Sequence, residues 1–393
     1  MIWPWTHELK HLLLYYENSI ARLILTHGAN LNELRMVHTI RIGIFALSIT
    51  LFCFRGHAQG EDASGNGLFS SDEVFDIRLS GNLRELMNDR VEEATYHPFT
   101  LSYQEGGSTA SFPVRVKTRG HFRRVKGNCT YPPLWLNFSK KTIAASPIFK
   151  GQDKTKLVTP CRDDKYVIQE YLVYKLYNLI TPKSFKARLV RVVYEDTVKG
   201  KSTEPLYGML LEEDDQMAKR NNAVFIDKKT ERPEQTDNAD FLKMAVFEYL
   251  VSNTDWSVQY LQNVKLIASD SLGTPSTVPY DFDHAGIVRA PYAKPAEELQ
   301  LNSTLTRRYR GYCVSDMAQF QEVFTLFNEL KDKIYSVYTS CALLDERYVK
   351  STVSFLDEFY KTINDPKDAS REFLYPCDKS GTGNVVIKGL NRD

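Results

Sequence analysis

The apolar periodicity of this chain changes part-way along its length, and this change limits the folds that it can adopt. Up to about residue 215, short segments alternate apolar and polar residues, as in FDIRLSG and FPVRVKTRG, which is typical of half-buried strands. We interpret PLWLNF, TKLVTP, ARLVRVVYED and PLYGMLLEED as further strands. Among them, KYVIQEYLVYKLYNLI has apolar residues at helical spacing and predicts a helix over 165–180.

Helical spacing dominates the rest of the chain. It predicts helices over 239–252, 316–338 and 345–362. Between the first two lie NVKLIAS and TVPYDF, which resemble a strand pair joined by a Gly-Pro turn. The pattern predicts an α+β fold with a β-rich first part that contains one helix, over 73–215, and a mainly helical second part that contains one strand pair, over 216–393.

The N-terminal region has the pattern of an export signal. Arg41 precedes an apolar run over 42–54, and small residues precede a possible cleavage point after Ala58. The run is shorter than the roughly 20 apolar residues of a transmembrane helix. We expect a cleaved signal peptide over 36–58, an upstream extension over 1–35 that is not translated, and a small, polar linker over 59–72. The alternative is a signal anchor with an N-terminal cytoplasmic segment.

A cleaved signal would place the protein outside the cytoplasm: secreted, periplasmic or at the cell surface, with no stable membrane span. Lys plus Arg (50) nearly equals Asp plus Glu (49), so no global field attracts nucleic acid, and no nucleic-acid partner is expected. Five of the six cysteines lie after the signal. In an oxidising compartment we expect Cys129 to pair with Cys161, and two of the three late cysteines to pair with each other.

A basic turn follows one of the predicted strands. The stretch VKTRGHFRRVKGN concentrates cationic side chains around Gly120, among them Arg119 and Arg123. A glycine at the tip of such a turn lets backbone and guanidinium groups approach a phosphate closely. The alternative is a solvated basic edge that discourages strand pairing.

Two acidic motifs come later in the chain. In NTDWSVQYLQN, Asp255 and Asn263 flank a loop between a helix and a strand, as in kinase-like folds that direct a carboxylate at a hydroxyl and a carboxamide at magnesium. The alternative is a helix cap or turn. In VPYDFDHAG, Asp281 and Asp283 end a strand on the same side of an extended chain. Carboxylate oxygens are ligands that Mg²⁺ prefers, although solvated charges at a hairpin end would give the same pattern.

The order of these motifs resembles the CotH family of kinase-like proteins, named for the spore coat protein. The matching stretches are TRGHFRRVKGNCTYPPLWLNF, KTKLVTPCRDDKYVIQEYLVYKLY, PLYGMLLEEDD, NTDWSVQYLQN and PYDFDHAG, over roughly residues 112–288. The resemblance implies a two-lobed, atypical protein-kinase-like fold. It implies Asp255 as catalytic base, Asn263 as a magnesium ligand, Asp281 as the principal metal aspartate and Asp283 as a second one. His284 is expected to pack or hydrogen-bond rather than to bind metal.

The resemblance also implies a nucleotide site in the β-rich lobe. The implied residues are Arg119, Gly120, Arg123, Lys154, Lys156, Glu170 and Glu213, with Glu212 as an alternative to Glu213. Two features depart from the family. Tyr131-Pro132-Pro133 stands where lysine-rich residues are usual, so either Lys154 or Lys156 would have to pair with phosphate. The interval from Asp255 to Asn263 is also long.

Three functions remain open from the sequence. The first is an atypical kinase that uses ATP with Mg²⁺ or Mn²⁺ to phosphorylate hydroxyls of an extracytoplasmic protein. The second is a catalytically silent kinase fold that binds a surface or assembly partner. The third is a phosphatase of the haloacid-dehalogenase type with Asp281 as nucleophile, which requires a parallel, doubly wound sheet.

Overall fold

The computed structural model describes residues 67–377, apart from residues 228 and 230. The expected upstream extension, the signal peptide and most of the linker lie outside the described residues. Within them, no helix combines the length and the apolar character needed to cross a membrane.

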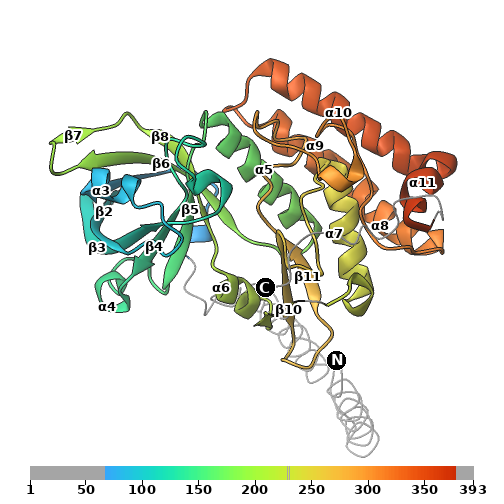
Figure 1. Ribbon diagram of the computed structural model, residues 1–393, viewed down its shortest axis with the longest axis horizontal. Helices are drawn as coiled ribbons and strands as arrows, with labels where there is room; N and C mark the ends of the chain where they lie inside the picture. Colours follow the sequence, from blue (N-terminus) through green and yellow to red (C-terminus); the bar gives the residue numbers. More distant parts are fainter. Residues whose placement is uncertain (1–66, 228, 230, 378–393) are drawn as a thin grey trace, which may run out of the picture. The chain divides into compact units, whose positions relative to one another are not determined.

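The N-terminal half of the described chain is a closed β-barrel (Figure 1). Its strands are neighbours in the order β1 (Phe75–Gly81), β2 (His97–Glu105), β3 (Ser108–Thr118), β4 (Leu134–Phe138), β5 (Lys154–Val158), β8 (Leu206–Leu211) and β6 (Ala187–Asp196). These pairs are antiparallel. The ring closes because β1 also pairs with β6, in parallel. Closure removes the free strand edges, and the short β7 (Lys201–Ser202) pairs with β6 outside the ring.

Alternating side chains fill the barrel, as the period-two pattern predicts. Along β1, and along β3 from Phe112 onward, every second residue is buried, and the rings of Phe112, Phe138 and Phe149 contact one another inside. The 3-10 helix η1 (Gly67–Phe69) adds Leu68 and Phe69 to this core. The end of the segment expected to be a linker therefore packs with the barrel, because it carries two large apolar residues.

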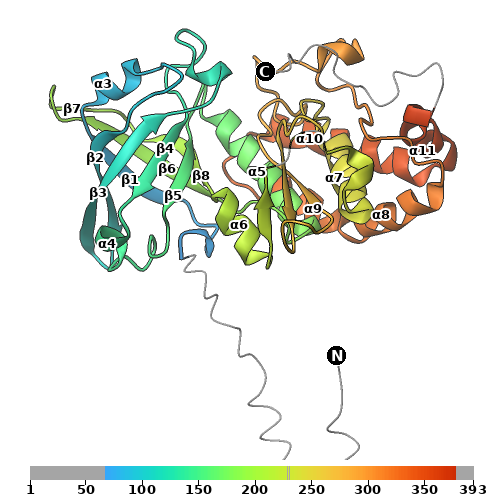
Figure 2. The ribbon, with the colours of Figure 1, turned by 60° about the horizontal axis from the view of Figure 1, so that its bottom comes forward.

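Helix α5 (Lys165–Ile180) lies between the barrel and the other long helices in both ribbon views (Figures 1 and 2). It contacts β6 and β8 of the barrel as well as the helices α7 and α9. Because it has neighbours on several sides, apolar or large side chains are buried around much of its circumference. Its position makes it the structural link between the two parts.

The C-terminal half is mainly helical, as expected. Its helices are α6 (Asp214–Arg220), α7 (Asn238–Val251), α8 (Met317–Glu329), α9 (Lys331–Thr339), α10 (Glu346–Asn364) and α11 (Pro366–Phe373). The prediction of a single helix over 316–338 is wrong in one respect, because this segment forms two helices that meet at Leu330. Both helices direct apolar residues to one core, which keeps the helical period nearly continuous across the break.

The sequence pattern missed several elements. Strand β2 begins at His97 and includes Pro98, and it was not expected. Short helices were also missed: α3 (Leu83–Asn88), α4 (Lys140–Ile143), α6, α11 and the 3-10 helices η2 (Phe122–Arg124), η3 (Pro233–Gln235), η4 (Glu297–Leu299) and η5 (Tyr375–Cys377). Such short helices contain too few turns to show a periodic pattern.

A small antiparallel sheet consists of β9 (Val224–Ile226), β10 (Val264–Ala268) and β11 (Ser276–Pro279). The predicted strand pair is therefore present, and Val264 lies opposite Pro279. The cysteines pair as expected, Cys129 with Cys161 and Cys313 with Cys377. Cys341 is the free thiol among the described residues.

Candidate functional site

The register of the β10–β11 hairpin brings Asn263 and Asp281 to the same end of the sheet. Because Val264 pairs with Pro279, the next residues outward, Asn263 and Tyr280, are also opposite each other. The amide of Tyr280 donates to the carbonyl of Asn263 at 3.0 Å. Asp281 follows immediately. The loop that ends at Asn263 and the segment that carries Asp281 thus meet through one strand pairing.

The sequence pattern predicts extended chain at Asp281, and this prediction is wrong. The φ of Asp281 is +63°, and its amide donates to the hydroxyl of Tyr174 on α5 at 2.8 Å. The cause is Phe282, which is fully buried and makes edge contacts with Tyr174 and Phe247 of α7, at ring-centroid distances of 4.8 and 5.7 Å. Burying this ring turns the chain, so the two aspartates do not simply share one face of a strand.

Asp255 lies in the loop after α7, and its neighbours hold its carboxylate. Its amide donates to the side-chain oxygen of Asn253 at 3.0 Å. Asn263 Nδ2 donates both to the Asp255 carbonyl at 2.7 Å and to Oδ2 at 3.1 Å, and Gln262 donates to Oδ1. His284 Nδ1 is 3.8 Å from Asp255 Oδ2. These bonds fix the Asn263 carboxamide with its nitrogen toward Asp255, so its oxygen faces away from that residue.

Arg123 joins the barrel to the second motif. It lies in η2, directly after the turn that follows β3. Its Nε is 2.9 Å and its Nη2 is 2.7 Å from Asp283 Oδ2, while Nη2 is also 3.0 Å from Glu170 Oε2 on α5. All three side chains are buried. Arg123 thus forms an internal ion-pair triad with Asp283 and Glu170, and its expected place near the nucleotide phosphates stays a prediction.

The pKa values of these carboxyls reflect their burial and the uneven distribution of charge. Burial, together with the charge of Asp283, raises the pKa of Asp281. Burial would also raise the pKa of Asp283, but Arg123, together with His284 and Tyr292, outweighs burial and the pKa is lowered. Burial raises the pKa of Glu170 to about 8 despite Arg123, and no described residue hydrogen-bonds to its Oε1. One buried arginine therefore faces more carboxyl groups than it can neutralise.

Lys156 on β5 is the second buried cation near the hairpin. Its Nζ is 2.6 Å from Asp214 Oδ1, and Lys265 Nζ on β10 is 3.1 Å from Oδ2 of the same aspartate. Burial lowers the pKa of Lys156 to about 8, although Asp214 opposes this shift. The ring of Tyr280 is 5.3 Å from Lys156 Nζ and 5.2 Å from Lys265 Nζ. The lysine pair thus lies beside the residue that precedes Asp281.

The remaining candidates lie around the same segment. Lys154 pairs with Glu213 at 3.0 Å, and Glu213 also caps α6. Glu212 is instead held by Arg220 at 2.9 Å. Gly120 has a φ of +85°, a conformation that favours glycine, and a side chain there would meet open space. Arg119 forms no ion pair within 4 Å among the described residues, although its charge lowers the pKa of Asp281.

Cavity size does not indicate this site. Cavities of about 470 and 440 Å³ are lined by barrel residues, the first by β1, β2, β3 and β6 with Pro205 and the second by β2, β3 and β4 with Ser139. Neither includes Asp255, Asn263 or Asp281. The candidate site is therefore defined by the chemistry and hydrogen bonding of its side chains.

The residues fit a divalent cation that shares its coordination with a phosphate. No group of three His, Cys, Asp or Glu side chains in the described ranges forms a complete metal site. Magnesium, however, binds through one or two carboxylates together with substrate phosphates. The Asn263 oxygen and the Asp281 carboxylate are hard oxygen donors, and Asp281 has no ion-pair partner within 4 Å among the described residues. Asp283 fits less well, because Arg123 occupies one of its oxygens.

Comparisons with known proteins add little to this geometry. No protein-family model matches the chain, so the CotH resemblance stays a prediction, and no curated protein matches it. Among solved structures, the chain is similar to the crystal structure of a Helicobacter pylori proinflammatory kinase, CtkA. The TM-score is 0.38 with 11% identity, over 62% of this chain and 90% of that chain. A likeness at this TM-score does not establish a function for this chain, so the function is inferred from the site.

Several residues of the site were missed by sequence reasoning. Tyr174 holds the Asp281 amide, Tyr292 hydrogen-bonds to Asp283 and lies near Arg123, and Lys265 shares Asp214 with Lys156. The tyrosines gave no signal, because the chain contains 22 of them. Lys265 was detectable in principle, since it follows Asn263 by two residues on a predicted strand.

Proposed function

We propose that this protein is a metal-dependent phosphotransferase with a kinase-like architecture that phosphorylates hydroxyl groups of a protein. The observation that carries the proposal is the hairpin register, which brings the Asp255–Asn263 loop and Asp281 to one end of the β10–β11 sheet. Phosphoryl transfer needs this combination of a carboxylate that orients an acceptor and oxygen ligands for a metal. The proposal also assigns ATP as the phosphate donor and an extracytoplasmic protein as the substrate.

Each residue of the candidate site has a defined role in this proposal. Asp255, held by Asn263 and Gln262, would accept a hydrogen bond from the attacking hydroxyl and orient it. Asn263 and Asp281 would hold Mg²⁺ or Mn²⁺, with Asp283 as a weaker contributor. Arg119 would face the phosphates. When bound, the cation would supply charge neutralisation on the phosphoryl oxygens.

Arg123 acts as a positioning residue in this proposal. By binding Glu170 and Asp283 together, it holds the turn after β3 against α5 and against the segment that carries Asp281. Gly120, on the same turn, would then approach phosphate through its backbone. Lys156 and Lys154 are held by Asp214 and Glu213, so either lysine would have to leave its carboxylate, or share it, to contact a phosphate.

That last observation favours a second candidate, a catalytically silent binding protein with the same architecture. Arg123, Lys154 and Lys156, three of the cations assigned to the nucleotide, each form an ion pair with a carboxylate. A fold that retains its acidic loop while its cations serve internal ion pairs would bind a partner without transferring phosphate. The phosphatase alternative is not proposed, because β1–β6 is the one parallel pair within the described sheets and no doubly wound parallel sheet is present there.

A labelled-phosphate assay distinguishes the two candidates. The chain is incubated with γ-labelled ATP, Mg²⁺ and a mixed set of acceptor proteins. The proposal predicts label on serine, threonine or tyrosine hydroxyls, together with at least a hundredfold loss in Asp255→Asn. Transfer that persists in Asp255→Asn would contradict the role of that residue. Absence of transfer in the wild type under Mg²⁺ and Mn²⁺ would favour the silent binder.

A further inference from the structure

Three cations alternate along the outward face at the end of β3: Arg115 and Lys117 lie on the strand, and Arg119 directly follows its last residue, Thr118. Val116 and Thr118, which lie between them, and Val114, which precedes them, are buried in the barrel, so the three cations share the outer face. Neighbouring side chains on one face of a strand are about 7 Å apart. We call these three residues the cationic strip. None of them lies within 4 Å of a carboxylate among the described residues, in contrast to Lys154 and Lys156 on β5.

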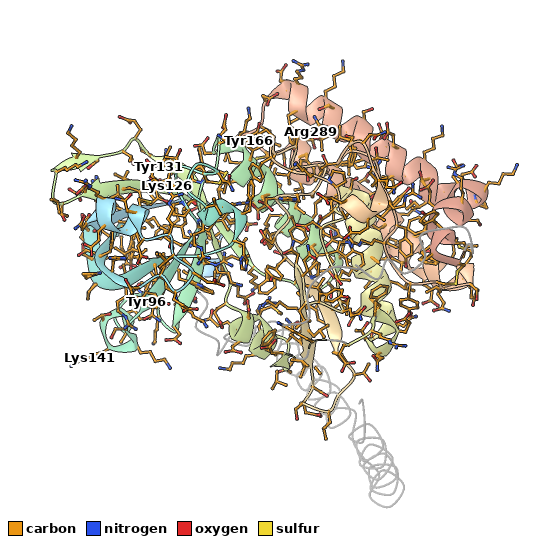
Figure 3. All side chains as sticks on the ribbon, viewed as in Figure 1. Tyr96, Lys126, Tyr131, Lys141, Tyr166 and Arg289 are labelled. Carbon is orange, nitrogen blue, oxygen red and sulfur yellow. A yellow bond between two sulfur atoms is a disulfide. The ribbon has the colours of Figure 1, made fainter. Side chains whose placement is uncertain are left out.

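Two aromatic rings hold the cationic strip in place. Trp135 on β4 pairs with Lys117 across the sheet, and the Arg119 guanidinium lies 5.2 Å from its ring centre. Tyr96, labelled on the barrel in Figure 3, has Arg115 at 5.2 Å and Lys117 at 4.9 Å from its ring centre. Cation–π contacts orient these long side chains without neutralising their charge. The strip is therefore an ordered surface that lacks its counter-charge.

The strip leads to the candidate site. Arg119 is followed by the Gly120 turn and then by Arg123, which binds Asp283. The charge of Arg119 also acts on Asp281. At its other end, Arg115 donates to Asn137 and helps to line the cavity of about 440 Å³ between β2, β3 and β4. A ligand lying along the strip would reach from this cavity toward the loop that carries Asp281.

We propose that the cationic strip docks an acidic, extended segment of the protein that is phosphorylated, and this proposal rests on the proposed function. The net charge of the whole chain is only +1, so the unpaired cations of the strip are a local excess. An extended peptide places alternate side chains about 7 Å apart as well, which matches the spacing along β3. The closed barrel offers no free edge for added backbone pairing, so recognition would use side-chain charge.

A single-stranded nucleic acid also presents regularly spaced anions. Such strands gain much of their affinity by stacking bases on exposed aromatic rings. Here three cations lie within 5.5 Å of the Trp135 ring centre, and two lie over Tyr96. These rings already serve as supports for cations, so the arrangement favours carboxylates over bases.

The test is fluorescence anisotropy of a labelled peptide of alternating Glu and Gly, titrated with the full chain in the absence of nucleotide. We expect binding that weakens as salt is added and that is at least about tenfold weaker in the double variant R115E/K117E. The matched control is K199E/K201E, which reverses the charges of two exposed lysines in the β6–β7 hairpin and should change the affinity less than about twofold. A milder double variant, R115Q/K117Q, is expected to fall between the wild type and R115E/K117E, and urea unfolding verifies that each variant is folded.

Because no nucleotide is present, docking is tested separately from phosphate transfer. Equal peptide affinity of the wild type and both folded strip variants would overturn the docking proposal and leave the phosphotransferase proposal standing. Tighter binding of a single-stranded oligonucleotide of matched length than of the peptide would also overturn it. Conversely, peptide docking without any phosphate transfer would support the strip and contradict the phosphotransferase.

Discussion

Arg123 Nη2 lies 2.7 Å from Asp283 Oδ2, and this contact ties the turn after β3 to the segment that carries Asp281. The same nitrogen is 3.0 Å from Glu170 on α5. Three segments that are distant in sequence therefore depend on one buried guanidinium. A planar guanidinium presents several donors in a fixed arrangement, so it can bridge two carboxylates in a way that lysine does not reproduce.

Replacing Arg123 should destabilise the protein strongly. Arg123→Met leaves Asp283 and Glu170 buried without their cation, and breaking such a buried pair costs about 3–5 kcal/mol. Urea unfolding measures the loss. The control is Arg191→Ala, which removes an exposed arginine paired with Asp76 and should cost no more than about 1 kcal/mol. Equal effects of the two substitutions would show that the triad contributes no more than a surface pair.

Lys156 should make stability increase with pH in the alkaline range. Its pKa is lowered to about 8 in the folded protein, whereas an unfolded lysine titrates near about 10.4. Between these values the unfolded chain binds more protons, so the free energy of unfolding rises with pH, by up to about 1.4 kcal/mol per pH unit. Lys156→Met should remove this rise, and urea midpoints at about pH 7.5 and about pH 9.5 measure it. A rise that is unchanged in Lys156→Met would assign it to another group.

At Asn263, the effect of the side chain on metal binding can be measured separately from the effect of the backbone conformation on stability. Its φ is +51°, a conformation that glycine adopts freely and that costs other residues about 1–2 kcal/mol. Asn263→Gly should therefore be more stable than Asn263→Ala in urea unfolding, while both variants lose metal–nucleotide binding equally. Retained binding in either variant would remove Asn263 from the metal ligands.

The two disulfides should contribute unequally to stability. In the chain-entropy model, cross-links over 32 and 64 residues stabilise the folded state by about 3.7 and about 4.3 kcal/mol. The serine pairs C129S/C161S and C313S/C377S should both lower the urea midpoint, the second slightly more. Cys341→Ser, which removes the free thiol of the described chain, should have a small effect. A larger loss from Cys341→Ser than from either pair would contradict this pairing.

The general organisation of the fold follows from local periodicity, but the assembly of the site does not. Alternation identified most barrel strands and helical spacing identified α5, because in both cases the buried face is set within a few residues. The two partners of Arg123 were not predictable, since Glu170 and Asp283 lie 47 and 160 residues away in the sequence. The left-handed turn at Asp281 was likewise hidden, because it results from the packing of Phe282 between two helices. The acidic loop and hairpin were recognisable because both of their motifs are local.

Nucleotide binding tests the central claim most directly. Thermal unfolding of the full chain is measured with ATP and Mg²⁺, with ATP and Mn²⁺, and without ligand. The account predicts a rise in Tm of at least about 3 °C that requires both metal and nucleotide. It predicts that Asp281→Asn loses this rise and that Asp270→Asn, at an exposed position in the β10–β11 turn, keeps it. An unchanged Tm of the wild type under every metal and nucleotide condition would contradict a phosphotransferase and leave a binding protein.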